Sequence, residues 1–209
     1  MNKPVLLLAL LALPTNAATV RTLDNEFSLS GASRIEVKIA VGDLEVVGVG
    51  GDAVKVHVDA SCPNATDAEC RSLADNIAVG NRRSGDALVI EIEGFPKLRS
   101  NRLSANVRIE MPRALPLSTN TGVGDVHVAG LVGDVEIDSG VGDVRVKIDP
   151  DKVRSAELDS GVGDVTLKIK DQVIEGSGFV GQGLDWSSGK GTAKLEVDTG
   201  VGDIAVELD

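Results

Sequence analysis

The chain has 209 residues and a formal net charge of −11, and only 2% of its residues are aromatic. An acidic surface repels phosphates, and so few aromatic side chains cannot build a stacking platform for bases, which excludes nucleic-acid binding. The length fits one domain.

The first 17 residues have the three parts of a secretory signal. Lys3 gives a short basic start, Val5–Leu13 is an uncharged run rich in Leu and Ala, and Thr15-Asn16-Ala17 offers small residues to a signal peptidase. The apolar run is far shorter than the ~20 residues that a membrane span needs. We therefore expect residues 1–17 to be removed and residues 18–209 to act as one domain in the periplasm or outside the cell, with no transmembrane segment.

Residues 18–120 are predicted to form opening strands around a helical insert at 62–78. Apolar and polar residues alternate in several short runs, which is the pattern of a strand with one buried face. These runs are Ile35–Ile39, Leu44–Val46, Val54–Val58, Ala87–Glu93 and Asn106–Met111, the last two joined by the basic loop Lys97–Arg102.

The insert contains one predicted helix and the only two cysteines, Cys62 and Cys70. The helix is expected over Asp67–Asn76, with Thr66 as N-cap and Glu69 as the third helical residue, the arrangement of a capping box. In an oxidising compartment, an isolated and closely spaced cysteine pair predicts a disulfide. The bridge would contribute about 2–3 kcal/mol to stability.

Residues 121–209 are dominated by one repeated turn. Val-Gly-Asp occurs at 41–43, 123–125, 132–134, 141–143, 162–164 and 201–203, and Gly122, Gly140, Gly161 and Gly200 extend four of these to Gly-Val-Gly-Asp. Alternating strands follow most of the turns. We interpret the glycine as needed for a sharp corner, the aspartate as an acceptor for turn amides, and the valine as a core residue. Asp134 is expected to mark a second corner.

The spacing of the turn aspartates indicates the fold. Asp125 to Asp143 is 18 residues, Asp143 to Asp164 is 21, and Asp164 to Asp203 is 39. Asp185 lies midway in the long step and is interpreted as a degenerate copy. Steps near 20 residues with glycine corners predict a right-handed β-solenoid, an all-β fold of stacked coils. An antiparallel β-sandwich is the alternative, because it also has glycine turns at short spacing.

Three segments together resemble a known family. Val-Arg-Ile-Glu-Met-Pro at 107–112, Leu-Pro-Leu at 115–117 and Thr-Gly-Val-Gly-Asp-Val at 121–126, with its recurrences, resemble the bacterial "putative adhesin" β-strand-repeat domains of unknown function. These are relatives of the head GIN and toastrack-type domains. The resemblance covers roughly residues 35–208 and does not account for the cysteine-bridged insert. It implies a β-solenoid fold and a role at the cell envelope, and it supplies no catalytic residues.

The aspartate turns also raise the question of calcium. Exported β-rolls bind Ca²⁺ through G-G-x-G-x-D-x-U-x repeats, but here glycine and aspartate are adjacent and the steps are longer. Ca²⁺ wants 6–8 oxygen ligands. A structural role for the turns is therefore favoured, with weak association of divalent cations along a column of carboxylates about 4.8 Å apart. Its members are expected to be Asp125, Asp143, Asp164, Asp185 and Asp203.

Catalytic groups are not indicated by the sequence. His57 and His127 occupy outward positions of strands and are expected to be solvated. No serine lies in the G-x-S-x-G turn that a nucleophile elbow needs. We therefore expect no catalytic residues, no cofactor and no enzymatic activity. Trp186, the only tryptophan, either packs locally against the core or marks a contact surface.

The predicted function is that of a non-enzymatic, adhesin-like envelope protein, a structural or protein-binding module. Because the chain ends at Asp209, just after the strand Ile204–Leu208, its last coil is expected to offer a free edge. That edge would bind an envelope protein or another copy of the chain. A calcium-binding repeat protein and an enzyme acting on polysaccharide are the alternatives.

Overall fold

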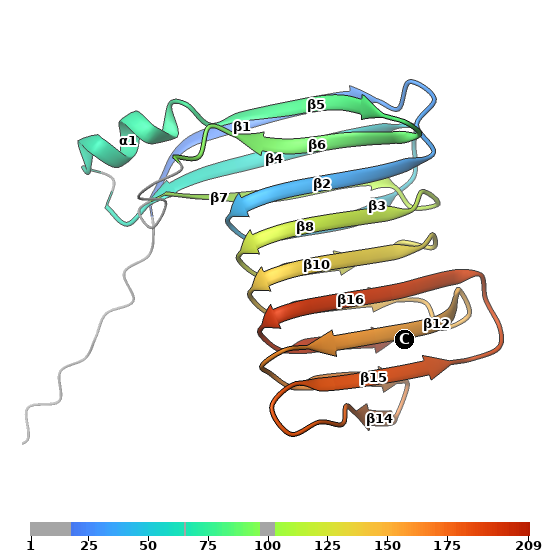
Figure 1. Cartoon of the computed structure of the whole chain (residues 1–209). Helices are drawn as coiled ribbons and strands as arrows, with labels where there is room; N and C mark the ends of the chain where they lie inside the picture. Colours follow the sequence, from blue (N-terminus) through green and yellow to red (C-terminus); the bar gives the residue numbers. More distant parts are fainter. Residues whose placement is uncertain (1–17, 65, 97–102) are drawn as a thin grey trace, which may run out of the picture.

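The computed structural model describes residues 18–64, 66–96 and 103–209. The expected signal segment and the basic loop Lys97–Arg102 lie outside these residues. The described strands form two sheets (Figure 1). Sheet A has the spatial order β1 (Ala18–Ser28), β4 (Ala53–Cys62), β7 (Ser104–Pro112), β3 (Leu44–Val49), β9 (Val126–Ala129), β11 (Val144–Ile148), β17 (Ile204–Leu208), β13 (Val165–Ile169) and β14 (Gln172–Glu175). Sheet B has the order β15 (Gln182–Ser187), β12 (Val153–Ser160), β16 (Ala193–Val201), β10 (Val135–Val141), β8 (Leu117–Val123), β2 (Arg34–Val41), β6 (Ala87–Glu93) and β5 (Ala78–Ser84).

Pairs of consecutive strands pass from sheet B to sheet A through a Val-Gly-Asp turn. These coils are β2–β3, β8–β9, β10–β11, β12–β13 and β16–β17. Within each sheet, strands of neighbouring coils are parallel and in register. Antiparallel strands lie toward the ends, where β1 pairs with β4, β5 with β6, β13 with β14 and β12 with β15. The fold is therefore mostly β, with two mixed sheets.

The order of the coils differs from the predicted order. The last coil in the chain, β16–β17, lies between β10–β11 and β12–β13. The prediction of a free edge on Ile204–Leu208 is therefore wrong, because this strand is paired on both sides. Asp185 is not a turn residue either, since it lies inside β15 opposite Glu157. The long step from Asp164 to Asp203 is filled by β14 and β15, which turn back at the end of the sheets.

The core lies between the two sheets and consists of aliphatic side chains. Alternate residues of the strands are buried, as in β11, where Val144, Val146 and Ile148 point inward. Such alternation removes one face of each strand from water and drives the sheets together. Trp186 is partly buried and packs against this core.

The one helix of the described residues, α1 (Ala68–Ala74), lies at the end of the molecule formed by β1 and β5 (Figure 1). The Cys62–Cys70 disulfide ties it to β4, which confirms the predicted bridge. The predicted cap is wrong: Asp67 is the N-cap, and its carboxylate accepts a hydrogen bond from the Cys70 backbone N–H at 3.0 Å. Cys70 thus occupies the third helical position that we assigned to Glu69. No helix within the described ranges is long and apolar enough to cross a membrane.

Candidate functional site

Hydrogen bonds link the turn aspartates of successive coils into a continuous row. In each case a backbone N–H donates to the Oδ1 of the preceding aspartate: Asp125 to Asp43 at 3.0 Å, Asp143 to Asp125 at 2.9 Å, Asp203 to Asp143 at 3.0 Å and Asp164 to Asp203 at 2.8 Å. We call these five residues the aspartate ladder. Each N–H places a partial positive charge beside a carboxylate oxygen, which offsets the repulsion between neighbouring carboxylates.

Two amide side chains terminate the ladder. At one end, the Asn106 Oδ1 accepts a hydrogen bond from the Asp43 N–H at 3.2 Å. At the other, the Gln182 Nε2 donates to the Asp164 Oδ1 at 2.9 Å while its Oε1 accepts from the Val165 N–H at 3.0 Å. Sequence reasoning missed both residues, because neither belongs to a repeat. They satisfy the ends of the row without adding charge.

Changing one member of the ladder should separate hydrogen bonding from charge. Asp143→Asn keeps an Oδ1 acceptor for the Asp203 N–H and removes one carboxylate from the row, together with its exposed ion pair to Arg145 at 3.3 Å. Such a pair contributes little, so stability should change little. Asp143→Ala removes the acceptor and should cost about 1 kcal/mol. The free energy of unfolding from urea titrations measures both. Equal losses in the two variants would contradict this account of the ladder.

The predicted metal ligands are only partly brought together. Asp125, Asp143, Asp164 and Asp203 lie in the ladder, whereas Asp185 lies in β15. Within the part of the chain that the structure describes, no three His, Cys, Asp or Glu residues are grouped to hold a metal ion. Weak association of calcium with the ladder stays a prediction. Adding calcium to metal-depleted protein should raise its melting temperature slightly, and an unchanged value would contradict it.

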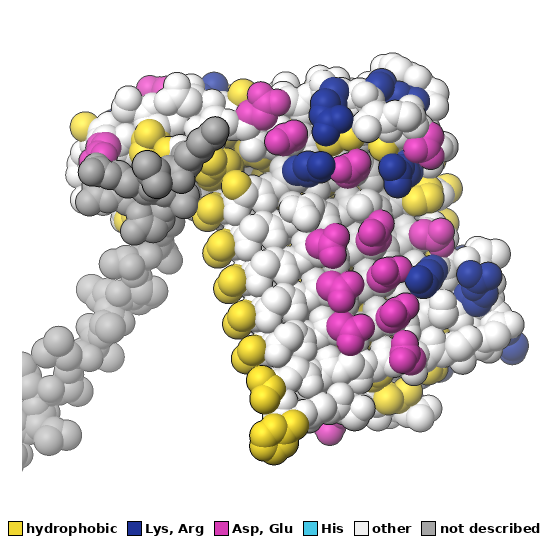
Figure 2. Space-filling view, viewed as in Figure 1, with side chains coloured by type: hydrophobic (Ala, Val, Ile, Leu, Met, Phe, Trp, Pro, Cys, Tyr) yellow, Lys and Arg dark blue, Asp and Glu magenta, His cyan; other side chains and the backbone are white. Residues whose placement is uncertain are grey.

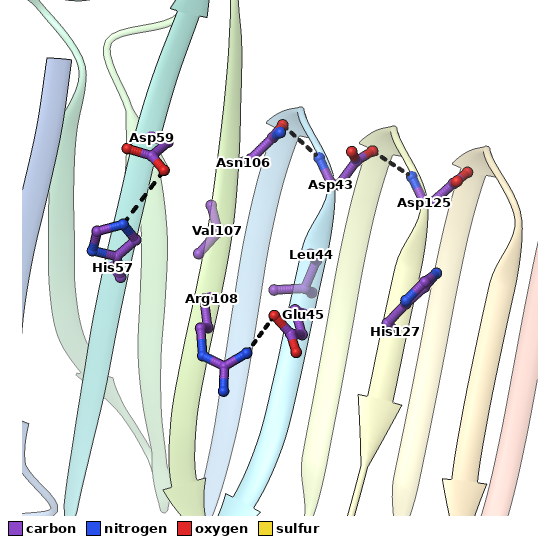
Figure 3. A pocket seen from close by; sticks show the side chains of 10 residues that line it. All are labelled: Asp43, Leu44, Glu45, His57, Asp59, Asn106, Val107, Arg108, Asp125 and His127. Carbon is purple, nitrogen blue, oxygen red and sulfur yellow. Dashed lines mark hydrogen bonds and ion pairs between the residues drawn. The ribbon is translucent and has the colours of Figure 1, made fainter. Parts of the chain in front are cut away.

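A shallow depression of about 410 Å³ lies on the outer face of sheet A (Figure 3). A row of side chains from adjacent strands crosses it: His57, Arg108, Glu45 and His127 line the depression, and Asp24 and Arg145 continue the row beyond its two ends. The His57 Nδ1 lies 2.7 Å from the Asp24 Oδ1, Arg108 is ion-paired with Glu45, and the Arg145 Nη1 donates to the His127 Nε2 at 3.1 Å.

Both histidines lie on this exposed face, as the sequence predicts, but each has a partner. His127 receives a hydrogen bond from an arginine, and His57 lies between two carboxylates, with its Nε2 3.4 Å from the Asp59 Oδ2. The cations of the row are thus matched by neighbouring acceptors. Among the described residues, the hydrogen-bond partners of the two histidine side chains are Asp24 and Arg145, and neither is a hydroxyl or thiol nucleophile. The row is an ion-pair network across open sheet surface.

The ion pair of His57 should make stability depend on pH. The hydrogen bond to Asp24 raises the pKa of His57, and the charge of Asp59 adds to this effect. A raised pKa in the folded state means that the contribution is complete below the unfolded pKa of about 6.5 and is lost as pH rises through the folded pKa. The free energy of unfolding should therefore fall between pH 6 and pH 8.5 by more in the wild type than in His57→Gln. Identical pH profiles would contradict this role of His57.

In four of the six repeated turns the valine lies on the surface rather than in the core, which corrects our interpretation. Val41 and Val132 are half-buried. The exposed fractions are 48% for Val123, 46% for Val141, 47% for Val201 and 51% for Val162. The valine sits where the chain passes from one sheet to the other, so its side chain points away from both sheets. The strands on either side still bury their alternate residues.

These valines form one row along the edge of the molecule. Val41, Val123, Val141 and Val201 are in register across sheet B, and the Gly202 N–H donates to the carbonyl of Val162 at 2.9 Å. Figure 2 shows the row as a line of apolar side chains down one edge. We call Val41, Val123, Val141, Val201 and Val162 the valine edge. Two more exposed apolar residues, Phe179 and Val180, follow in the loop between β14 and β15.

Comparison with known proteins supports one family. The model of the N-terminal domain of toast_rack (DUF2154) matches residues 18–168. The crystal structure of a putative cell adhesion protein from Clostridium sporogenes aligns with a TM-score of 0.50 and 13% identity, over 90% of this chain and 99% of that one. A putative adhesin from Bacteroides fragilis aligns with a TM-score of 0.40 and 14% identity, over 89% and 97%. No curated protein matches. The chain belongs to the toast_rack N-terminal domain family, as its resemblance to toastrack-type domains predicts.

Proposed function

We propose that this chain is a non-enzymatic, exported cell-envelope protein, an adhesin-like module that binds another protein through the valine edge. In this proposal the fold is a short right-handed β-solenoid in which one coil, β16–β17, lies out of its order in the chain. The rigid stack of coils holds the valines in a straight row.

The exposure of the turn valines carries the proposal. A valine that is about half exposed adds little to the core, and a polar residue at the same turn would interact better with water. Single apolar residues on a surface need no explanation, but a contiguous exposed row is typical of a protein interaction site. Because the valine recurs in successive coils, the exposed row is a regular feature of the fold rather than a single apolar residue, which supports a binding surface.

Other features support export to an oxidising compartment and a non-enzymatic role. The N-terminal segment has the composition of a secretory signal, and the Cys62–Cys70 bridge suits an oxidising compartment. Hydrolysis of polysaccharide needs a pair of carboxyl groups flanking the bond that is cleaved. In the described residues, N–H groups bind the carboxylates of the aspartate ladder, and other carboxylates lie on open sheet faces.

Cross-linking in envelope extract tests the proposal. Val123→Thr/Val141→Thr/Val201→Thr keeps the shape of three turn residues while making them polar, and it should leave the melting temperature unchanged. The wild type should capture a partner protein that mass spectrometry identifies and that the triple variant loses. Val173→Thr is the matched control, because Val173 is 56% exposed but lies in β14, away from the valine edge. Capture of the same partner by the triple variant would contradict the proposal.

A further inference from the structure

Carboxylates border the valine edge along its whole length on the side of sheet A, and at Val141, Val201 and Val162 on the side of sheet B. On the side of sheet A, the aspartate ladder follows each valine by two residues. The residues three before Val41 and Val123 are Lys38 and Asn120. On the side of sheet B, Asp138, Asp198 and Asp159 precede Val141, Val201 and Val162 by three residues and lie in register with one another. We call Asp138, Asp198 and Asp159 the near column. Figure 2 shows acidic side chains gathered on the lower half of sheet B, inward from the row of valines.

A second acidic column lies farther from the valines. It consists of Glu136, Glu196 and Glu157, each two residues before a member of the near column, and we call it the far column. Its charge is partly balanced, because the Lys194 Nζ lies 2.7 Å from the Glu196 Oε2 and 3.7 Å from the Glu157 Oε2. The far column therefore has a cation of its own within the fold.

Within the described residues, no ion pair balances the negative charge of the near column. Among the ion pairs of the described residues, none reaches Asp138, Asp198 or Asp159. Loss of water around Asp198 raises its pKa, and the neighbouring charges of Asp159 and Asp138 raise it further. A cation brought to this column would relieve that repulsion.

From this arrangement we infer that the valine edge binds a partner segment whose apolar row is bordered on both sides by Lys or Arg, such as one face of a cationic amphipathic helix. The inference rests on the proposed function and adds the chemistry of the partner. Strands lie about 4.8 Å apart, so the five valines span roughly 19 Å, the length of about 13 helical residues. Glycines flank Val123, Val141, Val162 and Val201 on both sides, so no side chain of an adjacent residue in the chain covers these four valines.

The same charges disfavour two other occupants. An anionic lipid surface attracts basic segments and would repel carboxylates on both sides of the apolar row. A second copy docked by a twofold contact would place acidic columns against acidic columns. Both occupants are outcomes that the experiment below can detect.

A defined peptide tests the inference with the full chain. The probe is an 18-residue helical peptide with Leu along one face and Lys on both flanks, and its control is a scrambled peptide of the same composition. Fluorescence anisotropy should show at least about tenfold tighter binding of the ordered peptide, weakened by added salt because the attraction is electrostatic in part. Equal binding of the scrambled peptide would overturn the inference, since attraction by net charge alone would then suffice.

Two triple variants with the same change in charge locate the contact. Asp138→Asn/Asp198→Asn/Asp159→Asn should weaken binding of the ordered peptide about tenfold, because it removes the carboxylates next to the valines. Glu136→Gln/Glu196→Gln/Glu157→Gln changes the same three strands two residues farther away and should weaken binding less than about threefold. Val141→Thr/Val201→Thr should also weaken it. Equal loss in the two charge variants would overturn the inference.

The remaining outcomes separate this inference from the proposed function. If no ordered cationic peptide binds but the envelope partner is still lost with the valine variant, the inference fails and the proposed function stands. If the partner is also retained by the valine variant, both fail. Binding to anionic vesicles, or a dimer that the valine variant abolishes, would overturn the inference in favour of a lipid surface or a second copy.

Discussion

Replacing Gly142 with alanine is expected to destabilise the protein by roughly 4 kcal/mol or more. Gly142 has a φ of +149°, a conformation that side chains disfavour, and an added Cβ would lie 2.0 Å from the carbonyl oxygen of Gly124 in the next coil. That neighbour is itself packed on Gly42, and Gly202 packs on Gly142 from the other side. The backbone cannot shift at one coil without moving the next, so the clash cannot relax locally. Urea unfolding measures the loss.

Two glycines outside the stack of coils separate the cost of the backbone conformation from the cost of the clash with the neighbouring coil. Gly51 has a φ of +126° with nothing within 4 Å of an added Cβ, so Gly51→Ala should lose only about 1–2 kcal/mol for the backbone conformation. Gly50 is equally open and has no such φ, so Gly50→Ala should be close to neutral. If Gly142→Ala cost no more than Gly51→Ala, the close approach of the coils would have no part in stability.

Removing the last coil is expected to abolish the cooperative fold of the repeat region. A chain that ends at Ser188 lacks β16 and β17, which lie between β10–β11 and β12–β13. The coils β10–β11 and β12–β13 would each lose the backbone hydrogen bonds and core contacts that they make with β16–β17. The truncation would therefore open a gap in the middle of the stack. Circular dichroism and hydrogen exchange of the truncated protein measure this, and β12 should lose its protection.

A deletion of similar length at the end of the stack is the control. Replacing residues 171–190 with a short Gly/Ser linker removes β14 and β15, which pair with the rest on one side only. This variant should keep a cooperative transition with a lower melting temperature. In the intact protein, amides of β16 should exchange as slowly as those of β10. Fast exchange of β16, or a milder effect of the truncation than of the internal deletion, would argue against the central position of the last coil.

The local structure and much of the core follow from the pattern of residues along the chain. Alternation of apolar and polar residues predicted strands such as Val144–Ile148, and these residues are buried as expected. The glycine corner, the second corner at Asp134 and the Cys62–Cys70 bridge were also predicted, and the Asp134 Oδ1 accepts a hydrogen bond from the neighbouring Lys194 N–H. Such features depend on short stretches of chain, whose pattern records which face is buried and where the backbone must turn.

The order of the coils and the composition of the surfaces depend on contacts between distant parts of the chain. Every coil carries the same turn, so the sequence cannot distinguish a neighbour in the chain from a neighbour in space, and β17 pairs with both β11 and β13. The turn valine is exposed because two sheets diverge from it, a relation that no single strand pattern contains. Asn106 and Gln182 end the aspartate ladder from outside the repeats. Strands with equivalent turns pair in the order that gives the most burial and hydrogen bonding for the whole chain. That total depends on contacts that form only in the folded protein.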